Sequence, residues 1–388
     1  MSETNNVKPL YDYGKLYSSH VDYSDCYPST SEKVIEIVKE CYKNKRRIRI
    51  RGSGHTFNGC TLPTKDELLV RTDNLNWFRY EGDSSITVGA GALVWDIRDL
   101  VEESGFQMPV YNGGWAGPTL GGYINAGGFG KGSLSETAGG LWENIISITF
   151  VDGTGEIHTI QRDDKIFQWL FSSYGQLGII IEAKLKLAPT NPLSLMLYPK
   201  DFKGRVPKIQ IDDPKDNDFP QSEREKILFW FSLLISKDQE KDAWQAMLDF
   251  TIRNQQIIPN GGWAGPVSKG QHIGYRYDIK FHTFNPPLLF PKNNDFIVMG
   301  VMSFIEIDHQ DDNSDILKLE ADFIALAKKN NFKLYLQAEN IGRNIDYQEY
   351  YGKTVYQYFK DLKERFDPLH LINAGNIFPI EDVDADES

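Results

Sequence analysis

The chain has 388 residues, 40 % of them hydrophobic and 13 % aromatic, which is enough for large folded cores and argues against a disordered protein. Its 42 basic and 54 acidic side chains give a net charge of −12, which argues against binding nucleic acid or an anionic membrane surface. Three scattered cysteines, Cys26, Cys41 and Cys60, make neither a disulfide framework nor a zinc site, so no metal is expected.

The N-terminal sequence and the length of the apolar runs indicate the cellular compartment of the protein. The opening MSETNNVKPLYDYG has no basic segment followed by an apolar one, so no secretory signal is expected. No apolar run approaches the roughly 18 residues of a membrane helix. We therefore expect a cytoplasmic protein that has no membrane partner.

Residues 24–190 are predicted to form a first α+β unit, preceded by an N-terminal extension at 1–23. Ser29, Thr30 and Ser31 offer N-cap oxygens to a helix whose apolar residues Val34, Ile35, Val38 and Cys41 share one face. The alternating RIRIRG that follows predicts a strand, with Ile48 and Ile50 on one side. The glycine turn RGSGHTFNGC, residues 51–60, comes directly after it.

The rest of this unit repeats the same pattern of short elements. DELLVRTDNLNWFRY and SSITV predict strands, and a helix is predicted from about Trp95 to Glu103. LWENIISITFVDGTGEIHTI predicts a hairpin that turns at residues 152–155. QWLFSSYGQLGIIIEAKLKLAP predicts a helix, a turn and a strand that stops at Pro189.

A proline- and charge-rich stretch after Pro189 indicates a linker into a second α+β unit at 191–340. Its predicted strands are KILFWFSLLIS, HIGYRYDIKFHTF, FIVMGVMSFIEID and FKLYLQAEN, and its predicted helices are KDAWQAMLDFTIRN and SDILKLEADFIALAKKNN. Residues 341–380 predict one helix and a proline-containing turn, and 381–388 form an acidic tail.

Two glycine-rich stretches are the strongest chemical signal. Residues 113–132 hold nine glycines in twenty positions, a density that suits close approach of the backbone to a large ligand. In RGSGHTFNGC, the N–H groups from Gly52 to Thr56 could form an anion nest. Neither the P-loop nor the dinucleotide fingerprint fits, because no Gly-Lys-Ser/Thr and no helix follow. His55 by itself is more often a structural residue, and it has no metal-ligand partners at suitable spacing.

Four stretches together resemble the FAD-linked oxidase family of the vanillyl-alcohol oxidase and p-cresol methylhydroxylase type. This family includes aldonolactone oxidases, cytokinin dehydrogenases and berberine-bridge-like enzymes. In the family's order the stretches are the helix–strand–turn ending in RGSGHTFNG, then GPTLGGYINAGGFGKGS, YGQLGIIIEAKLKLAP and FDPLHLINAGNIF. The resemblance implies a two-lobed α+β FAD-binding domain at 24–190, a smaller α+β substrate (cap) domain at 191–340, and a segment at 341–380 that returns to the FAD domain.

The resemblance also implies where FAD binds. His55 occupies the position of the histidine that many members bond covalently to the flavin 8α-methyl group. Gly52, Ser53, Gly54 and Thr56 would contact the diphosphate. The other implied cofactor residues are Pro118, Thr119, Gly121, Gly122, Asn125, Gly127 and Gly128 beside the flavin and diphosphate, Gly178 and Ile180 at the adenine end, and Asn373 and Asn376 near the flavin ring. The second loop lacks the cysteine of doubly bonded members, and Cys60 reads as a buried small apolar residue.

Hydride transfer to flavin needs a base for the substrate proton. Arg276, Asp278, Glu306 and Glu339 lie on predicted strands of the second unit, and Glu306 is favoured because a buried strand precedes it. The segment YYGK adds Tyr350, Tyr351 and Lys353 as candidate pocket residues. It resembles the His-Trp-Gly-Lys segment of the sugar-oxidising branch. Tyr350 and Tyr351 stand in place of its histidine and tryptophan, which argues against a sugar or polyol substrate.

The resemblance implies an FAD-dependent oxidoreductase that moves a hydride from a C–OH or C–N carbon of a small molecule to flavin N5, and a biosynthetic tailoring step is one role it allows. Gly128 stands where oxygen-using aldonolactone oxidases have glycine, which favours O₂ as acceptor. Three alternatives stay open: a dehydrogenase with another acceptor, an NADPH-dependent reductase of an enol ether, against which His55 counts, and a non-catalytic flavin-holding protein.

Overall fold

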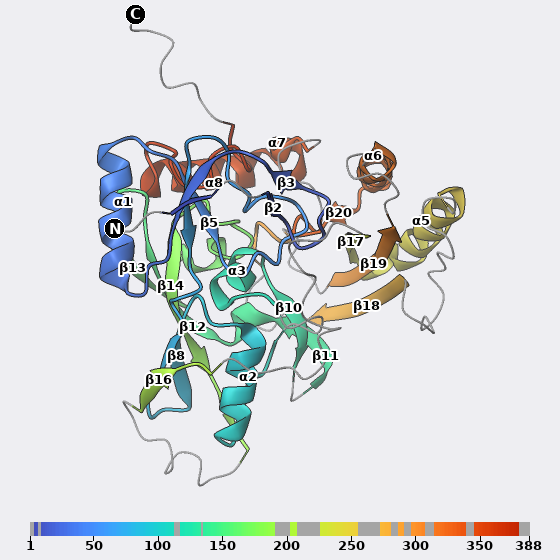
Figure 1. Ribbon diagram of the computed structural model, residues 1–388. Coiled ribbons are helices and arrows are strands. Elements are labelled where there is room, and N and C mark those ends of the chain that lie inside the picture. Colours follow the sequence, from blue (N-terminus) through green and yellow to red (C-terminus); the bar gives the residue numbers. More distant parts are fainter. Residues whose placement is uncertain are drawn as a thin grey trace, which may run out of the picture.

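The computed structural model describes residues 4–6, 9–111, 117–132, 135–190, 202–207, 226–254, 272–280, 286–290, 296–306, 314–338 and 345–379. Within these ranges the strands form one four-stranded sheet, two six-stranded sheets and two two-stranded pairs. Figure 1 shows helices distributed around these sheets. The mixture confirms the predicted α+β class.

The four-stranded sheet carries the start of the predicted first unit. Its order is β1 (Thr4–Asn6), β4 (Tyr23–Cys26), β6 (Leu68–Arg71) and β5 (Ile48–Arg51). β4 and β5 both run parallel to β6, and helix α1 (Ser31–Lys43) lies between β4 and β5 in sequence, as a parallel connection requires. The parallel arrangement brings the end of β5, and therefore the turn at 51–60, beside the end of β6.

Helix α1 begins where predicted, because the Thr30 side chain accepts a hydrogen bond from the Lys33 N–H. Its buried face consists of Val34, Ile37, Val38 and Cys41, whereas Ile35 is only partly buried. This face packs in one apolar cluster with residues of β5, β6, β12 and β14. α1 therefore joins the four-stranded sheet to the second sheet.

The second sheet is antiparallel, in the order β13 (Ile157–Gln161), β12 (Ile145–Val151), β14 (Ile179–Lys186), β8 (Ser85–Gly89), β7 (Trp77–Tyr80) and β16 (Lys203–Arg205). The hairpin of β12 and β13 confirms the predicted turn at 152–155. Helix α2 (Val94–Glu103) confirms the predicted helix after β8, and β9 (Phe106–Gln107) pairs with β15 (Ala188–Pro189).

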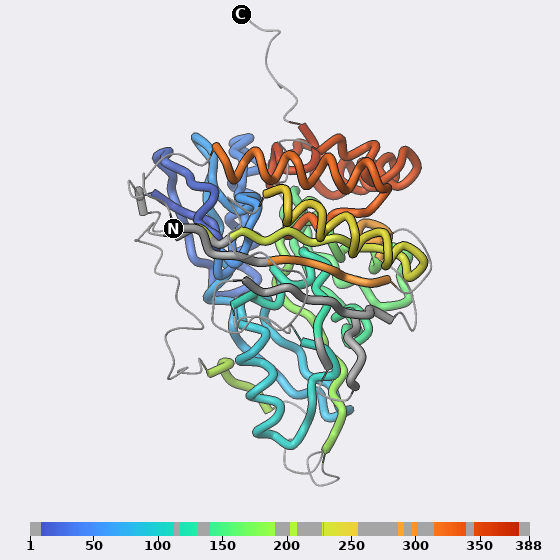
Figure 2. The backbone as a smooth tube through the Cα atoms, turned by 90° about the vertical axis from the view of Figure 1, so that its right-hand side faces the viewer, coloured from blue at the N-terminus to red at the C-terminus, as the bar shows by residue number. Residues whose placement is uncertain are grey.

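The third sheet has the order β10 (Phe129–Gly132), β11 (Ser135–Gly140), β18 (His272–Lys280), β19 (Phe296–Glu306), β17 (Lys226–Ser236) and β20 (Lys333–Leu334). Helices α5 (Glu240–Arg253) and α6 (Ser314–Lys329) pack against β17 and against each other, and Figure 2 shows them on the outer side of this sheet. β10 and β11 belong to the range predicted for the FAD unit, yet β11 pairs with β18. One sheet therefore draws on both predicted units.

Three predicted elements are shorter than expected. The predicted helix in QWLFSSYG is only the 3₁₀ turn η2 (Phe167–Trp169), and the predicted strand FKLYLQAEN is a strand only over β20. The predicted C-terminal helix is two helices, α7 (Tyr347–Tyr351) and α8 (Lys353–Phe366). The break lies at Gly352, whose φ of 80° is accessible to glycine but interrupts a helix.

The N-terminal extension is folded onto the rest of the chain. β2 (Leu10–Tyr11) and β3 (Ser18–Ser19) form a hairpin, which we call the N-terminal hairpin. The Tyr13 N–H donates to the Thr56 carbonyl at 2.8 Å, and the Tyr17 hydroxyl bonds the Glu320 carboxylate of α6 at 2.7 Å. The hairpin therefore covers the turn at 51–60 and connects it to α6.

Within the described ranges, no helix is both long enough and apolar enough to cross a membrane. The same residues contain no group of three or more His, Cys, Asp or Glu side chains placed to hold a metal ion. The acidic tail at 381–388 lies outside the described residues.

Candidate functional site

A cleft lies where the ends of β5, β6 and β8 meet the short helix α3 (Leu120–Asn125). It encloses about 560 Å³, including space open to solvent. The predicted cofactor residues that line it are Gly52, Thr56, Gly121, Gly122, Asn125, Ile180 and Asn373.

The two glycine loops predicted to bind one ligand meet in the structure. A Cβ on Gly52 would lie 2.3 Å from the Thr119 Oγ1, so only glycine allows this contact. The Ser53 hydroxyl donates to the Gly117 carbonyl. A Cβ on Gly117 would lie 1.8 Å from the Cδ2 atom of His55, so the imidazole rests directly on the Gly117 backbone. Loop 51–60 and the loop that begins at 117 therefore form one wall.

The first loop offers free backbone donors. Among the described residues, the N–H groups of Gly52, Ser53 and Gly54 have no hydrogen-bond acceptor. Gly54 has φ of 82°, a conformation that glycine adopts without strain. Successive unpaired N–H groups in such a turn attract anionic oxygens. The geometry therefore fits the diphosphate of FAD.

His55 lies half-buried beside these donors. Its ring stacks on Tyr13 with 3.9 Å between centroids and 26° between planes. Loss of hydration on burial lowers the pKa of His55 to about 4. A hydrogen bond with its own backbone raises this pKa, but by less. The ring is therefore neutral at pH 7 and keeps a nitrogen lone pair.

Internal hydrogen bonds shape the second loop. Thr119 caps α3 by accepting from the Gly122 N–H at 3.3 Å, and the Gly121 N–H donates to the Ala90 carbonyl at 2.8 Å. The Asn125 side-chain oxygen accepts from the Ser173 hydroxyl at 3.0 Å and the Gly175 N–H at 3.1 Å. These N–H groups are already paired, so the loop can contribute shape to the cleft rather than further anion donors.

The other predicted glycines of this loop are in close packing contacts outside the cleft lining. A Cβ on Gly127 would lie 2.1 Å from the Ser172 hydroxyl, and one on Gly128 would lie 2.3 Å from the Tyr123 ring. The Pro118 carbonyl accepts from the Val94 N–H at 3.0 Å. Directly before β14, a Cβ on Gly178 would lie 2.5 Å from the Val151 carbonyl. Packing by itself thus accounts for glycine at 127, 128 and 178.

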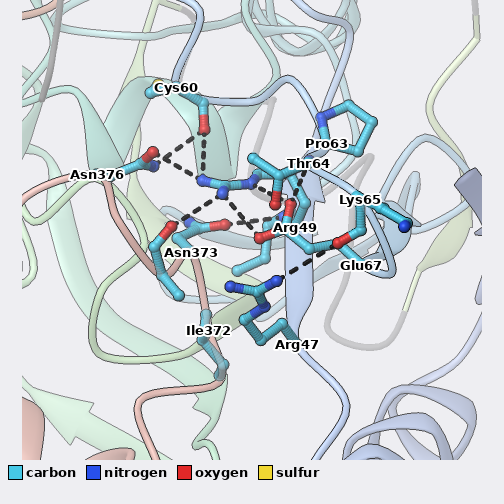
Figure 3. A network of polar contacts seen from close by, with 12 residues as sticks. Arg47, Arg49, Cys60, Pro63, Thr64, Lys65, Glu67, Ile372, Asn373 and Asn376 are labelled. Atoms are coloured by element: carbon cyan, nitrogen blue, oxygen red, sulfur yellow. Dashed lines mark hydrogen bonds and ion pairs between the residues drawn. The ribbon is translucent and has the colours of Figure 1, made fainter. Parts of the chain in front are cut away.

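The C-terminal turn is held to β5 by a buried arginine (Figure 3). Arg49 forms a bidentate pair with Glu67 at 2.8 and 3.0 Å and donates to the Asn376 side chain at 2.7 Å. Asn376 also donates to the Cys60 carbonyl at 2.9 Å. Both polar atoms of the Asn376 side chain are therefore occupied within the protein.

Asn373 lies in the same turn but lines the cleft. It has φ of 49°, which asparagine tolerates better than most residues. Its side-chain oxygen accepts from the Ile50 N–H at 2.9 Å and its amide donates to the Tyr174 carbonyl at 3.0 Å. It therefore closes the cleft by joining β5 to the loop before β14.

Several cleft residues were not predicted. They are Ile50, Thr61, Thr72, Ala90, Ala126, Tyr174, Gly175 and Gln337, together with Cys60, which was read as a bystander. Burial raises the pKa of the Cys60 thiol to about 12, so it is protonated there. Thr72 and Ala90 directly follow the predicted strands β6 and β8, a positional signal that could have found them. No such positional signal marks Gln337, because it belongs to the predicted second unit at 191–340.

The candidates Tyr350, Tyr351 and Lys353 are not among the residues that line this cleft. The Tyr350 hydroxyl donates to the Leu334 carbonyl at 2.5 Å, Tyr351 is buried, and Lys353 is exposed at the start of α8. Glu306 ends β19 in register with Lys226. The side chains of Glu306, Arg276 and Asp278, and all of Glu339, lie outside the described part of the structure.

A lysine that was not predicted packs on this tyrosine pair. The Lys333 Nζ lies 4.2 Å from the ring centroid of Tyr350 and 5.2 Å from that of Tyr351. Burial lowers the pKa of Lys333 to about 7. The structure thus adds a fourth polar side chain to the candidates Tyr350, Tyr351 and Lys353.

Comparison with known proteins agrees with the geometry. Residues 25–161 match the model of an FAD binding domain. The chain is 27 % identical over 187 residues to a D-arabinono-1,4-lactone oxidase of Candida glabrata, covering 46 % of this chain and 34 % of that protein. It is 27 % identical over 235 residues to a reticuline oxidase of Eschscholzia californica, covering 58 % and 41 %. It is 29 % identical over 174 residues to a mitochondrial D-2-hydroxyglutarate dehydrogenase of Rattus norvegicus, covering 42 % and 32 %.

Residues 25–161 therefore match an FAD-binding domain, and the chain resembles the vanillyl-alcohol oxidase and p-cresol methylhydroxylase family. This confirms the resemblance predicted from the four stretches. The chain matches only 34 %, 41 % and 32 % of the lengths of these three relatives.

Proposed function

We propose that the protein is an FAD-dependent oxidoreductase, and specifically an oxidase that takes a hydride from a C–OH or C–N carbon of a small molecule and is reoxidised by O₂. The observation that carries the proposal is the row of N–H groups at Gly52, Ser53 and Gly54 that have no acceptor among the described residues. They lie beside a cleft lined mostly by residues of the matched FAD domain. Relatives named as oxidases and as a dehydrogenase support redox chemistry.

Residues of the two glycine loops, of β14 and of the C-terminal turn would together bind FAD. Gly52 to Gly54 would hold the diphosphate, and Gly121, Gly122, Ile180 and Asn373 would form the walls. FAD, when bound, supplies the hydride acceptor at flavin N5. Glu306, in a cap at 191–340 that makes the protein two-lobed, and Tyr350, Tyr351 and Lys353, in the C-terminal segment, stay our candidates for the substrate side. We propose a cytoplasmic location. The net charge of −12 supports the absence of nucleic-acid and anionic-membrane partners.

We propose that His55 carries the flavin covalently. Attachment would join a ring nitrogen of His55 to the 8α-methyl carbon, with loss of one hydrogen from each and formation of H₂O₂ from O₂. The low pKa of His55 supports this role, because a neutral imidazole has the lone pair that the bond needs.

Acid precipitation of the purified protein tests this attachment. We expect a yellow pellet from the wild type and a colourless pellet from His55→Ala, whose flavin should leave with the supernatant. His158→Ala, a change at a histidine bonded to Asp152 on the hairpin of β12 and β13, serves as the control and should stay yellow. Equal acid-stable flavin in wild type and His55→Ala would refute the assignment.

The acceptor is tested separately by stopped-flow reoxidation after anaerobic reduction. For an oxidase, reoxidation by O₂ should be at least as fast as turnover with a dye acceptor. Reoxidation by O₂ that is slower than turnover with the dye would refute the oxidase proposal and favour a dehydrogenase. A screen for H₂O₂ formation across alcohols, sugars and amines would identify the substrate class.

A further inference from the structure

The imidazole of His55 is in contact with residues from different parts of the chain. One face stacks on the Tyr13 ring at 3.9 Å, and the ring also meets the Gly117 backbone, where no side chain would fit. The Phe57 ring lies edge-on at 6.4 Å. None of these contacts brings a charged side chain to the imidazole.

Tyr13 is itself held by the N-terminal hairpin. Its N–H donates to the Thr56 carbonyl at 2.8 Å, one residue past His55. At the start of the hairpin, the Tyr11 carbonyl accepts from the buried Arg51 guanidinium at 2.8 Å. At its far side, the Tyr17 hydroxyl bonds Glu320 of α6. The hairpin is thus anchored on the His55 turn and on α6, and these bonds hold the backbone of Tyr13 beside His55.

We propose that Tyr13 is a positioning residue for His55, and that its ring fixes the plane of the imidazole against Gly117 and keeps water from it. This inference rests on the proposed attachment of flavin at His55. The second torsion of a histidine side chain is broad, so an imidazole without a stacking partner samples several ring planes. Stacking selects one of them before the cofactor arrives.

The first test compares acid-stable with total bound flavin in the full-length chain. In Tyr13→Ala, the acid-stable fraction after a fixed time with FAD and O₂ should fall at least fivefold, while total bound flavin is retained. Tyr13→Phe keeps the flat ring and should restore the wild-type fraction. Tyr11→Ala removes a tyrosine ring from the same hairpin that packs on His20, and should match the wild type.

The second test does not need the cofactor. Titration of His55 by NMR in flavin-free full-length chain, assigned with His55→Ala, should give a pKa of about 4 for the wild type. Tyr13→Ala should move it towards the ordinary value near 6.5, because water reaches the ring, and Tyr13→Phe should not. If Tyr13→Ala does not fold, Tyr13→Leu replaces it in the first test, since it fills the space without a flat face, and its acid-stable fraction should fall at least fivefold.

The outcomes separate this inference from the proposed function. If the wild type binds FAD without acid-stable flavin, covalent attachment fails, and an unchanged Tyr13→Ala titration would then overturn the role of Tyr13 as well. If the wild type holds acid-stable flavin and Tyr13→Ala matches it in both readouts, attachment stands and the role of Tyr13 is refuted.

Discussion

Replacing Glu67 with glutamine is expected to lower the free energy of unfolding by about 3–5 kcal/mol, which is the usual effect of leaving one member of a buried ion pair unpaired. Glu67 and Arg49 are both fully shielded, with side-chain exposures of 0 % and 3 %. Glutamine has nearly the same shape, so the Arg49 charge would lose its counter-ion while the packing is kept. Urea denaturation of the two proteins gives the difference directly.

An exposed ion pair provides the control for this change. Lys33 and Glu36 of α1 lie 2.6 Å apart but are each 55 % exposed, so Lys33→Gln should cost less than about 1 kcal/mol. A loss below this limit in Glu67→Gln would show that the Arg49 network does not hold the C-terminal turn. Since Arg49 also bonds Asn376 and the Ala374 carbonyl, we expect the turn to loosen before the rest of the domain.

Replacing Asp367 with asparagine is expected to cost a similar 3–5 kcal/mol and to weaken FAD binding about tenfold or more. Asp367 pairs with the buried Lys363 at 2.7 Å and accepts the N–H groups of Leu371 and Ile372. Burial lowers the pKa of Lys363, and the Asp367 charge opposes that shift, so removing it leaves the amine poorly stabilised. Asn373 follows directly in the same turn, which is why the cleft should open.

Denaturation together with FAD titration measures both effects. Glu364→Gln removes the charge of an exposed pair with Lys360 on the same helix and should leave stability and affinity near the wild-type values. Unchanged FAD affinity in Asp367→Asn, despite lower stability, would show that the turn at 373 is not needed to shape the cleft.

The sequence by itself determined the local elements and the loops that meet at the cleft. Helix α1 follows from the helical spacing of its apolar residues, and the hairpin of β12 and β13 follows from its turn residues. Both signals depend only on residues a few positions apart in the sequence. The order of the four family stretches predicted the FAD domain, and Gly52, Gly121 and Asn373 do line one cleft. The alternation of RIRIR also gave a strand.

Only the tertiary structure decided what surrounds these loops. Arg49 and Arg51 look like a solvated strand face in the sequence, yet both are buried, because their partners Glu67, Tyr11 and Ala374 arrive from elsewhere in the chain. Tyr13 covers His55 from a segment that local patterns marked as an extension. Likewise β11 joins the sheet of β18 from more than a hundred residues away. Periodicity in the sequence predicts which side of a helix or strand is apolar. Which polar side chains are buried and hydrogen-bonded depends on packing partners that are distant in the sequence.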